Sequence, residues 1–265
     1  DILDITGLTD PARVALDSSD ADIHINSVEI LRASDNQNEL IAAIGPNTWD
    51  INGTDSGVLN GIIDFQGFAH LTGGEDIDTF NINRVGGVND IISGVIRGRG
   101  GDDVLNIDGL VDPNGISVAL GTENNGTFNL VDIQHINATS GEYTLIGANL
   151  ENTWVIDGQN QGQVSDVNFT GFAHLRGGAA NDEFIFDGVD EITGSVDGGA
   201  EPTSGQAIDT VNLEQLTNSV VVSLDQGTAV RDLYVLNIEN INANPANQAT
   251  NQIIAANGAN VWDIA

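Results

Sequence analysis

The fold of this chain is indicated most clearly by the segment Asn47-Thr48-Trp49-Asp50-Ile51-Asn52-Gly53. The segment returns about 105 residues later as Asn152-Thr153-Trp154-Val155-Ile156-Asp157-Gly158, and its beginning returns again at Asn260-Val261-Trp262-Asp263-Ile264. A second segment, Phe65-Gln66-Gly67-Phe68-Ala69-His70-Leu71, returns as Phe169-Thr170-Gly171-Phe172-Ala173-His174-Leu175. Tandem similarity of this kind is typical of repeat arrays, which extend a protein or present a surface.

A shorter pattern recurs inside each long repeat. It consists of Asp or Asn, any residue, and then two apolar residues separated by one other residue. The first apolar residue of each copy is Leu3, Trp49, Phe80, Leu105, Trp154, Phe184, Val211 or Trp262, with a weaker copy at Phe128. The copies lie about 25 residues apart, so each long repeat holds about four units. Their alternation predicts short β-strands that end in turn residues.

Two all-β architectures fit these strands. A tandem of immunoglobulin-like sandwiches would suit a period near 105 residues, since such domains have ~100 residues. In a parallel β-solenoid each short unit would instead be one coil, and coils resemble one another because they stack in register. The internal repetition favours the solenoid, so we predict a parallel β-helix, which we expect to be right-handed. Further predicted strands are Ile116–Leu120, Val220–Leu224 and Gly94–Gly98.

The repeats divide the chain into 1–46 as a partial unit, 47–151 and 152–259 as full units, and 260–265 as a partial unit. We expect one continuous array, cut from a longer protein, because the sequence begins and ends within a repeat. The three Trp residues lie on the apolar face of their strands and are expected in the core.

Charge and composition restrict the function classes. The chain has 39 acidic residues, no Lys and seven Arg, which gives a formal charge of −32. Such a surface repels nucleic acid and anionic lipid, so neither is an expected partner. Without Cys there is no disulfide, thiolate metal site or thiol nucleophile. No apolar run reaches the ~18 residues of a membrane span. Dispersed carboxylates favour a saline or calcium-rich extracellular medium.

Gly-rich acidic turns are the best candidates for a chemical role. They are Gly73–Phe80, Gly98–Leu105, Gly177–Phe184 and, with an insertion, Gly198–Asp209. They resemble the calcium-binding nonapeptide Gly-Gly-x-Gly-x-Asp-x-apolar-x of RTX proteins. The turns depart from it where Arg99 replaces the second Gly and where Asp76 and Ala180 replace the third Gly. The resemblance implies calcium as cofactor, with candidate ligands at Asp76, Asp78, Asp102, Asp103, Asp182 and Asp209.

Nearly the whole chain resembles the repeat region of large bacterial secreted adhesins, of the filamentous-haemagglutinin-like and biofilm-matrix kinds. The resemblance rests on Asn-x-Trp-x-Ile-x-Gly, then Phe-x-Gly-Phe-x-x-Leu-x-Gly-Gly, then Asp-x-apolar-Asn-apolar. It implies an exported cell-surface or matrix protein whose repeats hold a binding region away from the cell. Expected partners are further copies of the chain or matrix components, with polysaccharide bound outside this segment.

No catalytic site emerges from the sequence. The Arg residues are scattered, with only Arg97 and Arg99 close in sequence, and adjacent acids such as Asp102 and Asp103 face opposite sides of a strand. His70 and His174 occupy equivalent repeat positions and are expected to be structural. We therefore expect a non-enzymatic stalk. The alternatives are a self-assembling surface-layer or filament subunit and, with less support, a polysaccharide-active β-helix enzyme.

Overall fold

A computed structural model gives the fold of the chain. It describes residues 1–16, 21–34, 37–83, 91–110, 115–122, 126–139, 142–188, 192–200, 207–224, 233–247 and 251–254. These residues form β-strands, turns and one 3-10 helix, η1 (Pro245–Asn247), and no described residue is in an α-helix. No helix in this part of the chain is long and apolar enough to cross a membrane. Trp262 lies outside the described residues.

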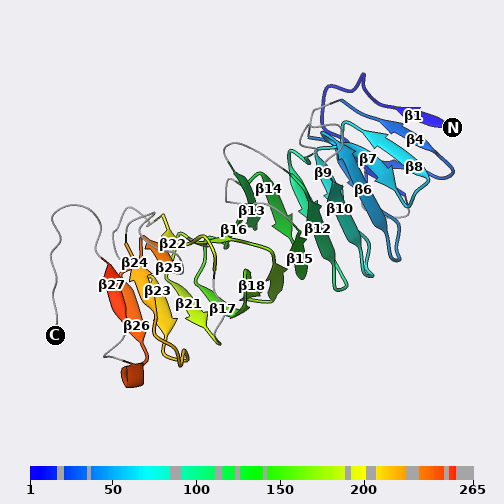
Figure 1. Cartoon of the computed structure of the whole chain (residues 1–265). Helices are drawn as coiled ribbons and strands as arrows, with labels where there is room; N and C mark the ends of the chain where they lie inside the picture. The colour runs from blue at the N-terminus through cyan, green and yellow to red at the C-terminus, as the bar shows by residue number, and fades with distance from the viewer. Residues whose placement is uncertain are drawn as a thin grey trace. The chain divides into compact units, whose positions relative to one another are not determined.

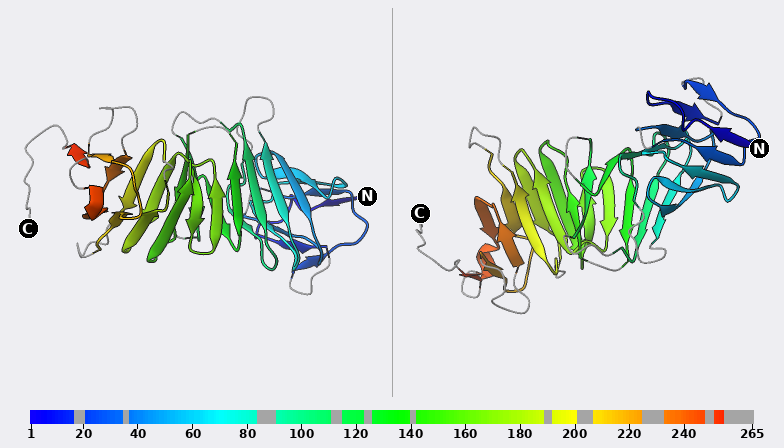
Figure 2. Two further views of the ribbon diagram at one scale, coloured as in Figure 1. Left: turned by 60° about the horizontal axis from the view of Figure 1, so that its bottom comes forward. Right: turned by 90° about the horizontal axis from the view of Figure 1, so that it is seen from above.

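The chain forms two compact units, each with strands in two sheets (Figures 1 and 2). Unit 1 comprises 1–143 and 166–171. Its sheet A contains, in spatial order, β1 (Ile2–Asp4), β4 (Ile30–Arg32), β8 (Ile63–Gln66), β7 (Ser56–Leu59), β6 (Thr48–Gly53), β10 (Thr79–Asn83), β12 (Val104–Asp108), β15 (His135–Ala138) and β19 (Val167–Thr170). Its sheet B contains β3 (Ile23–His24), β2 (Arg13–Ala15), β5 (Glu39–Ile41), β9 (His70–Thr72), β11 (Val95–Arg97), β14 (Phe128–Val131) and β13 (Ile116–Leu120).

Unit 2 comprises 144–165 and 172–265. Its sheet A contains β18 (Gln161–Val164), β17 (Asn152–Gly158), β21 (Asp182–Phe186), β23 (Thr210–Leu213) and β26 (Asn240–Ala243). Its sheet B contains β16 (Tyr143–Ile146, of which Tyr143 is counted with unit 1), β20 (His174–Gly178), β22 (Ser195–Gly199), β25 (Leu233–Leu236), β24 (Val221–Ser223) and β27 (Gln252–Ile254).

Parallel pairing between successive turns of the chain defines the fold as a β-solenoid. For example, β10 pairs in parallel with β6 on one side and with β12 on the other, which places Phe80 opposite both Trp49 and Leu105. Matching residues of neighbouring turns therefore stack, as the repeated pattern predicts. This pairing confirms the solenoid and excludes tandem sandwiches, whose sheets are antiparallel.

The Trp residues within the described ranges belong to the core, as predicted. Trp49 and Trp154 are fully buried. Trp49 stacks on Phe80 with ring centroids 5.6 Å apart, and Trp154 stacks on Phe184 at 5.3 Å. Each large aromatic surface is thus buried against the ring one turn away, and this burial contributes to the cohesion of each unit.

The strands recur after every eleven elements. The buried centres of β2, β13 and β24 are Val14, Val118 and Val222, which are spaced by about 105 residues. One copy of the short pattern was misplaced, however. Phe128 lies in sheet B, whereas the sheet A strand after Leu105 is β15 around Ile136. The sequence Gln134-His135-Ile136 hides this copy because Gln replaces the acidic residue.

Each unit also contains an antiparallel segment that the repeat pattern did not predict. In unit 1, β7 pairs antiparallel with both β6 and β8, and in unit 2 β18 pairs antiparallel with β17. Asn60 and Gly61 join β7 to β8 with φ angles of 54° and 66°. An Asn-Gly pair at positive φ is the preferred short hairpin turn, so this dipeptide was the available signal.

Candidate functional site

The Gly-rich acidic turns take part in a ladder of hydrogen bonds in unit 1, which we call the turn ladder. Its members, Asn47, Asp78, Asp103 and Gln134, each lie two residues before the first buried apolar residue of a sheet A strand. Asp78 Oδ1 accepts the backbone N–H of Asn47 at 2.8 Å, and Asp103 Oδ1 accepts that of Asp78 at 2.7 Å. Gln134 Oε1 in turn accepts the N–H of Asp103 at 2.8 Å.

Unit 2 has the same ladder, built from Asn152, Asp182, Asp209 and Glu239. Asp182 accepts the N–H of Asn152 at 2.9 Å, Asp209 accepts that of Asp182 at 2.8 Å, and Glu239 accepts that of Asp209 at 2.8 Å. Asp182, Asp209 and Glu239 thus each satisfy a backbone donor one turn away, where a buried N–H without a partner would be costly.

Close packing against these carboxylates requires glycine at the neighbouring positions. A Cβ at Gly73 would lie 2.2 Å from Asp78 Oδ2, and a Cβ at Gly177 would lie 2.2 Å from Asp182 Oδ2. The next residue then completes the carboxylate, because Gly74 N–H donates to Asp78 Oδ2 at 2.5 Å and Gly178 N–H donates to Asp182 Oδ2 at 2.6 Å. The Gly-Gly-x-x-x-Asp spacing thus has a structural explanation.

Asp103 differs from Asp78 in one respect. Among the described residues, its fully buried Oδ2 has no hydrogen-bond partner, and the position of Gly74 is taken by Arg99 at φ 76°. Burial raises the pKa of Asp103 to about 6; the Asp78 N–H bond opposes that rise, and the charges of Asp78, Asp102 and Asp132 add to it. Burial also raises the pKa of Asp78. Asp103 therefore has a buried carboxylate that hydrogen bonds compensate only in part.

The six predicted calcium ligands fall into two groups. Asp78, Asp103, Asp182 and Asp209 are buried in the turn ladders, whereas Asp76 and Asp102 are exposed at the turns. The described residues contain no group of three or more His, Asp or Glu side chains arranged to hold a metal ion. A calcium ion takes 6–8 oxygen ligands. The buried Asp residues do not fit that need, because they point at backbone N–H groups, which leaves the exposed pair as the candidate ligands.

A second polar ladder runs along the outward side of sheet A in unit 1, and we call it the asparagine ladder. Asn81 donates to Asp50 at 3.0 Å, Asn106 to Asn81 at 2.9 Å, Asn137 to Asn106 at 3.0 Å, and Thr170 to Asn137 at 3.1 Å. From the sequence, Asn52, Asn81 and Asn106 would be grouped as polar residues at strand ends, but this is wrong for Asn52, since Asp50 lies opposite Asn81.

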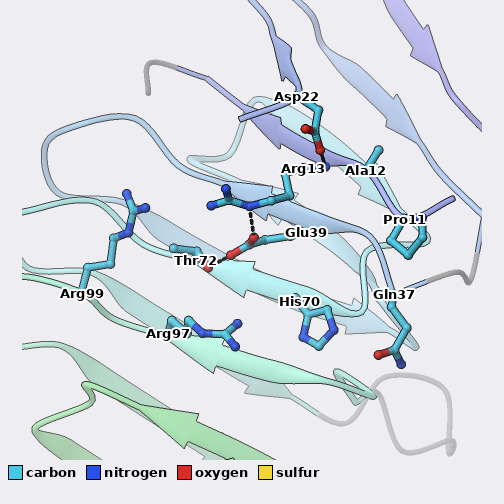
Figure 3. A pocket seen from close by; sticks show the side chains of 10 residues that line it. All are labelled: Pro11, Ala12, Arg13, Asp22, Gln37, Glu39, His70, Thr72, Arg97 and Arg99. Atoms are coloured by element: carbon cyan, nitrogen blue, oxygen red, sulfur yellow. Dashed lines mark hydrogen bonds and ion pairs between the residues drawn. The ribbon is translucent and has the colours of Figure 1, made fainter. Parts of the chain in front are cut away.

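A pocket on sheet B of unit 1 brings together residues that are far apart in sequence (Figure 3). It has a volume of about 510 Å³ and is lined by Pro11, Ala12, Arg13, Asp22, Gln37, Glu39, His70, Thr72, Arg97 and Arg99. Parallel stacking gathers them, because Arg13 lies opposite Glu39, Glu39 opposite His70, and Arg97 opposite Thr72. The expectation that the Arg residues are scattered is therefore wrong for these three.

Hydrogen bonds within the pocket fix the charge states of two groups. Glu39 accepts from Arg13 Nε at 2.7 Å and from Thr72 Oγ1 at 2.6 Å. Burial alone would raise the pKa of Glu39, but these bonds and the charges of Arg13 and Arg97 lower it overall. Burial and the Arg97 charge lower the pKa of His70, whose Nδ1 accepts the Val95 N–H at 3.0 Å. His70 is thus a neutral ring with its proton on Nε2.

His174, the repeat equivalent of His70, also bonds within its own unit, to Ser195 Oγ at 2.8 Å. Both His residues thus have the structural contacts that their repeat positions predict. No protein-family model, no curated protein sequence and no solved structure matches this chain.

Proposed function

We propose that this chain is a non-catalytic structural segment of an extracellular or cell-surface adhesin, which holds a binding region away from the cell. The observation that supports this role is that the features shared by the two units are scaffold features. They are the Trp–Phe stacks, the turn ladders and the antiparallel strands. A repeat array that keeps only its framework from copy to copy serves reach and stiffness.

Calcium is the cation that we propose to act on this segment, at the exposed acidic turns. The turns that carry Asp76 and Asp102 are stacked so closely that a Cβ at Gly101 would lie 2.6 Å from the Asp76 carbonyl carbon. Cations between such turns would offset the repulsion of a chain with a charge of −32.

Antibody labelling tests the location. An antibody raised against this segment should label intact cells or their extracellular matrix, and labelling that requires permeabilised cells would contradict the proposal.

A thermal melt in EGTA and in millimolar calcium, at one ionic strength, tests whether calcium binds. We expect a calcium-specific rise in Tm, because an ion that binds only the folded chain stabilises it. The control is Asp76→Asn/Asp102→Asn, which should remove the rise.

In-register deletion tests the structural role. Removal of 47–151 from the full-length protein joins Pro46 to Asn152, which begins an equivalent strand. The shortened protein should fold and keep its ligand specificity while binding at a shorter reach. Loss of all binding by a folded deletion protein would place the binding function within this segment instead.

A further inference from the structure

The pocket on sheet B of unit 1 concentrates positive charge on a strongly acidic chain. Arg13, Arg97 and Arg99 are three of the seven Arg residues of a protein with a charge of −32. Only two of the lining residues, Asp22 and Glu39, are acidic. The pocket therefore has one positive charge in excess when His70 is neutral, and this local sign is opposite to that of the whole chain.

The donors of this pocket are unequally used. Arg13 is held by Glu39. The guanidinium groups of Arg97 and Arg99 have no hydrogen-bond or ion-pair partner among the described residues. The His70 ring is held through Nδ1, and its Nε2–H likewise has no acceptor among the described residues. The guanidinium groups of Arg97 and Arg99 are planar and carry five N–H donors each, and the imidazole of His70 adds one more donor. Such a group of donors can bind an oxyanion.

The second copy of the repeat lacks this arrangement. Arg176 occupies the position of Thr72, Asp197 that of Arg97, and these two form an ion pair at 3.7 Å. Arg176 of unit 2 thus has an ion-pair partner, whereas Arg97 of unit 1 has none among the described residues. Since the scaffold repeats and the charges do not, folding alone does not explain the Arg residues.

Arg99 adds a sign of function from its backbone. It has a φ of 76°, and the equivalent position of the other Gly-rich turns is Gly74, Gly178 or Gly199. A long side chain at positive φ costs stability that glycine would not. It also leaves Asp103 Oδ2 without the N–H donor that Gly74 gives to Asp78. Strain of this kind collects at binding sites.

We propose that this pocket binds a small hydroxylated monocarboxylate of the uronic acid type. One excess positive charge matches one carboxylate, whereas a polyanion would meet the repulsion of the surrounding acidic surface. The planar guanidinium groups bind the carboxylate through paired N–H bonds, while Gln37 and His70 donate to hydroxyl groups. A volume of about 510 Å³ is within the range of sugar-sized ligand sites. The proposal is independent of the stalk role.

NMR of the arginine side chains tests the site on the whole chain. Galacturonate is titrated at constant ionic strength, with galactose and inorganic phosphate as comparisons. Saturable shifts are expected at the Nε–H signals of Arg97 and Arg99 with galacturonate, and binding should be at least tenfold weaker with galactose and with phosphate. Arg99→Gly should raise Tm, because it restores the residue of the other turns, and weaken galacturonate binding at least fivefold. Arg97→Gln should also weaken galacturonate binding at least fivefold, and it should leave the Tm unchanged.

Arg32→Gln is the matched control, since it removes one charge from an exposed residue on sheet A of the same unit and should leave binding unchanged. Several results would overturn the proposal. They are the absence of saturable shifts, tighter binding of phosphate than of galacturonate, and equal loss of binding in Arg32→Gln and Arg97→Gln. Concentration-dependent shifts without ligand would overturn it as well, because they would assign the pocket to an acidic side chain of a second copy.

Discussion

Replacement of Asp103 by Asn should stabilise this protein at neutral pH, although it alters a fully buried residue of the turn ladder. The carbonyl oxygen of the new amide would still accept the N–H of Asp78, which Asp103 Oδ1 accepts at 2.7 Å. The amide nitrogen would replace Oδ2, a buried oxygen that accepts no hydrogen bond among the described residues. The substitution would therefore remove a buried negative charge that is only partly compensated by hydrogen bonds.

The magnitude follows from the pKa of Asp103, which is about 6 in the folded chain against 3.8 for a free side chain. The stabilising contribution of the protonated group is present below about pH 3.8 and is lost as the pH rises through about 6. This shift corresponds to about 3 kcal/mol at most, and solvent screening reduces it to roughly 1–2 kcal/mol. The Tm of Asp103→Asn should rise by about 3–6 °C.

The assay is thermal and urea unfolding of both proteins between pH 4 and pH 8. The stability gain should be small at pH 4 and reach its plateau above pH 7. Asp78→Asn is the matched control with the opposite sign. Both oxygens of Asp78 accept N–H groups, so an amide would set a donor against a donor and cost about 1–3 kcal/mol. The reasoning is refuted if Asp103→Asn gives no gain at pH 7.5 or an equal gain at pH 4.

Three further substitutions test the framework by unfolding measurements. Gly177→Ala should lower the free energy of unfolding by more than about 2 kcal/mol, because its Cβ would lie 2.0 Å from Gly198 O. Gly7→Ala, which has open space around the new Cβ, should leave the free energy of unfolding nearly unchanged. Equal effects of the two substitutions would contradict the packing argument. Trp154→Ala should cost about 3–5 kcal/mol and Trp154→Phe clearly less, and a cost below about 1 kcal/mol would show that the stack on Phe184 is unimportant. Asn106→Ala should cost about 1 kcal/mol by interrupting the asparagine ladder, while Asn52→Ala outside it should have no measurable effect.

The sequence predicted the stacked strands and their buried residues, but it missed the antiparallel strands β7 and β18, although these also repeat. Trp49 and Trp154 were assigned to the core because a strand with alternating apolar residues has one buried face. The Asp residues were singled out as candidate calcium ligands, but spacing alone does not tell whether a carboxylate faces a cation or a backbone N–H.

The pocket could not be predicted from linear distance. Arg13 and Arg97 approach one another only because β2, β5, β9 and β11 are successive neighbours in sheet B. The positions of their equivalents in the second copy hold other residues, so repetition gave no signal either. Arg99 in a glycine position of the turn was the single local clue.

The regular spacing of the turn ladders has a genetic consequence. Asn47, Asp78, Asp103 and Gln134 recur in the same order as Asn152, Asp182, Asp209 and Glu239, and the last three side chains of each set accept the backbone N–H of the preceding member. An unequal crossover between the codons of Trp49 and Trp154 would therefore remove or add one whole period of about 105 residues without a mismatch in pairing. Alleles that differ in the number of periods would all encode folded chains, so the length of such a protein can vary by recombination alone.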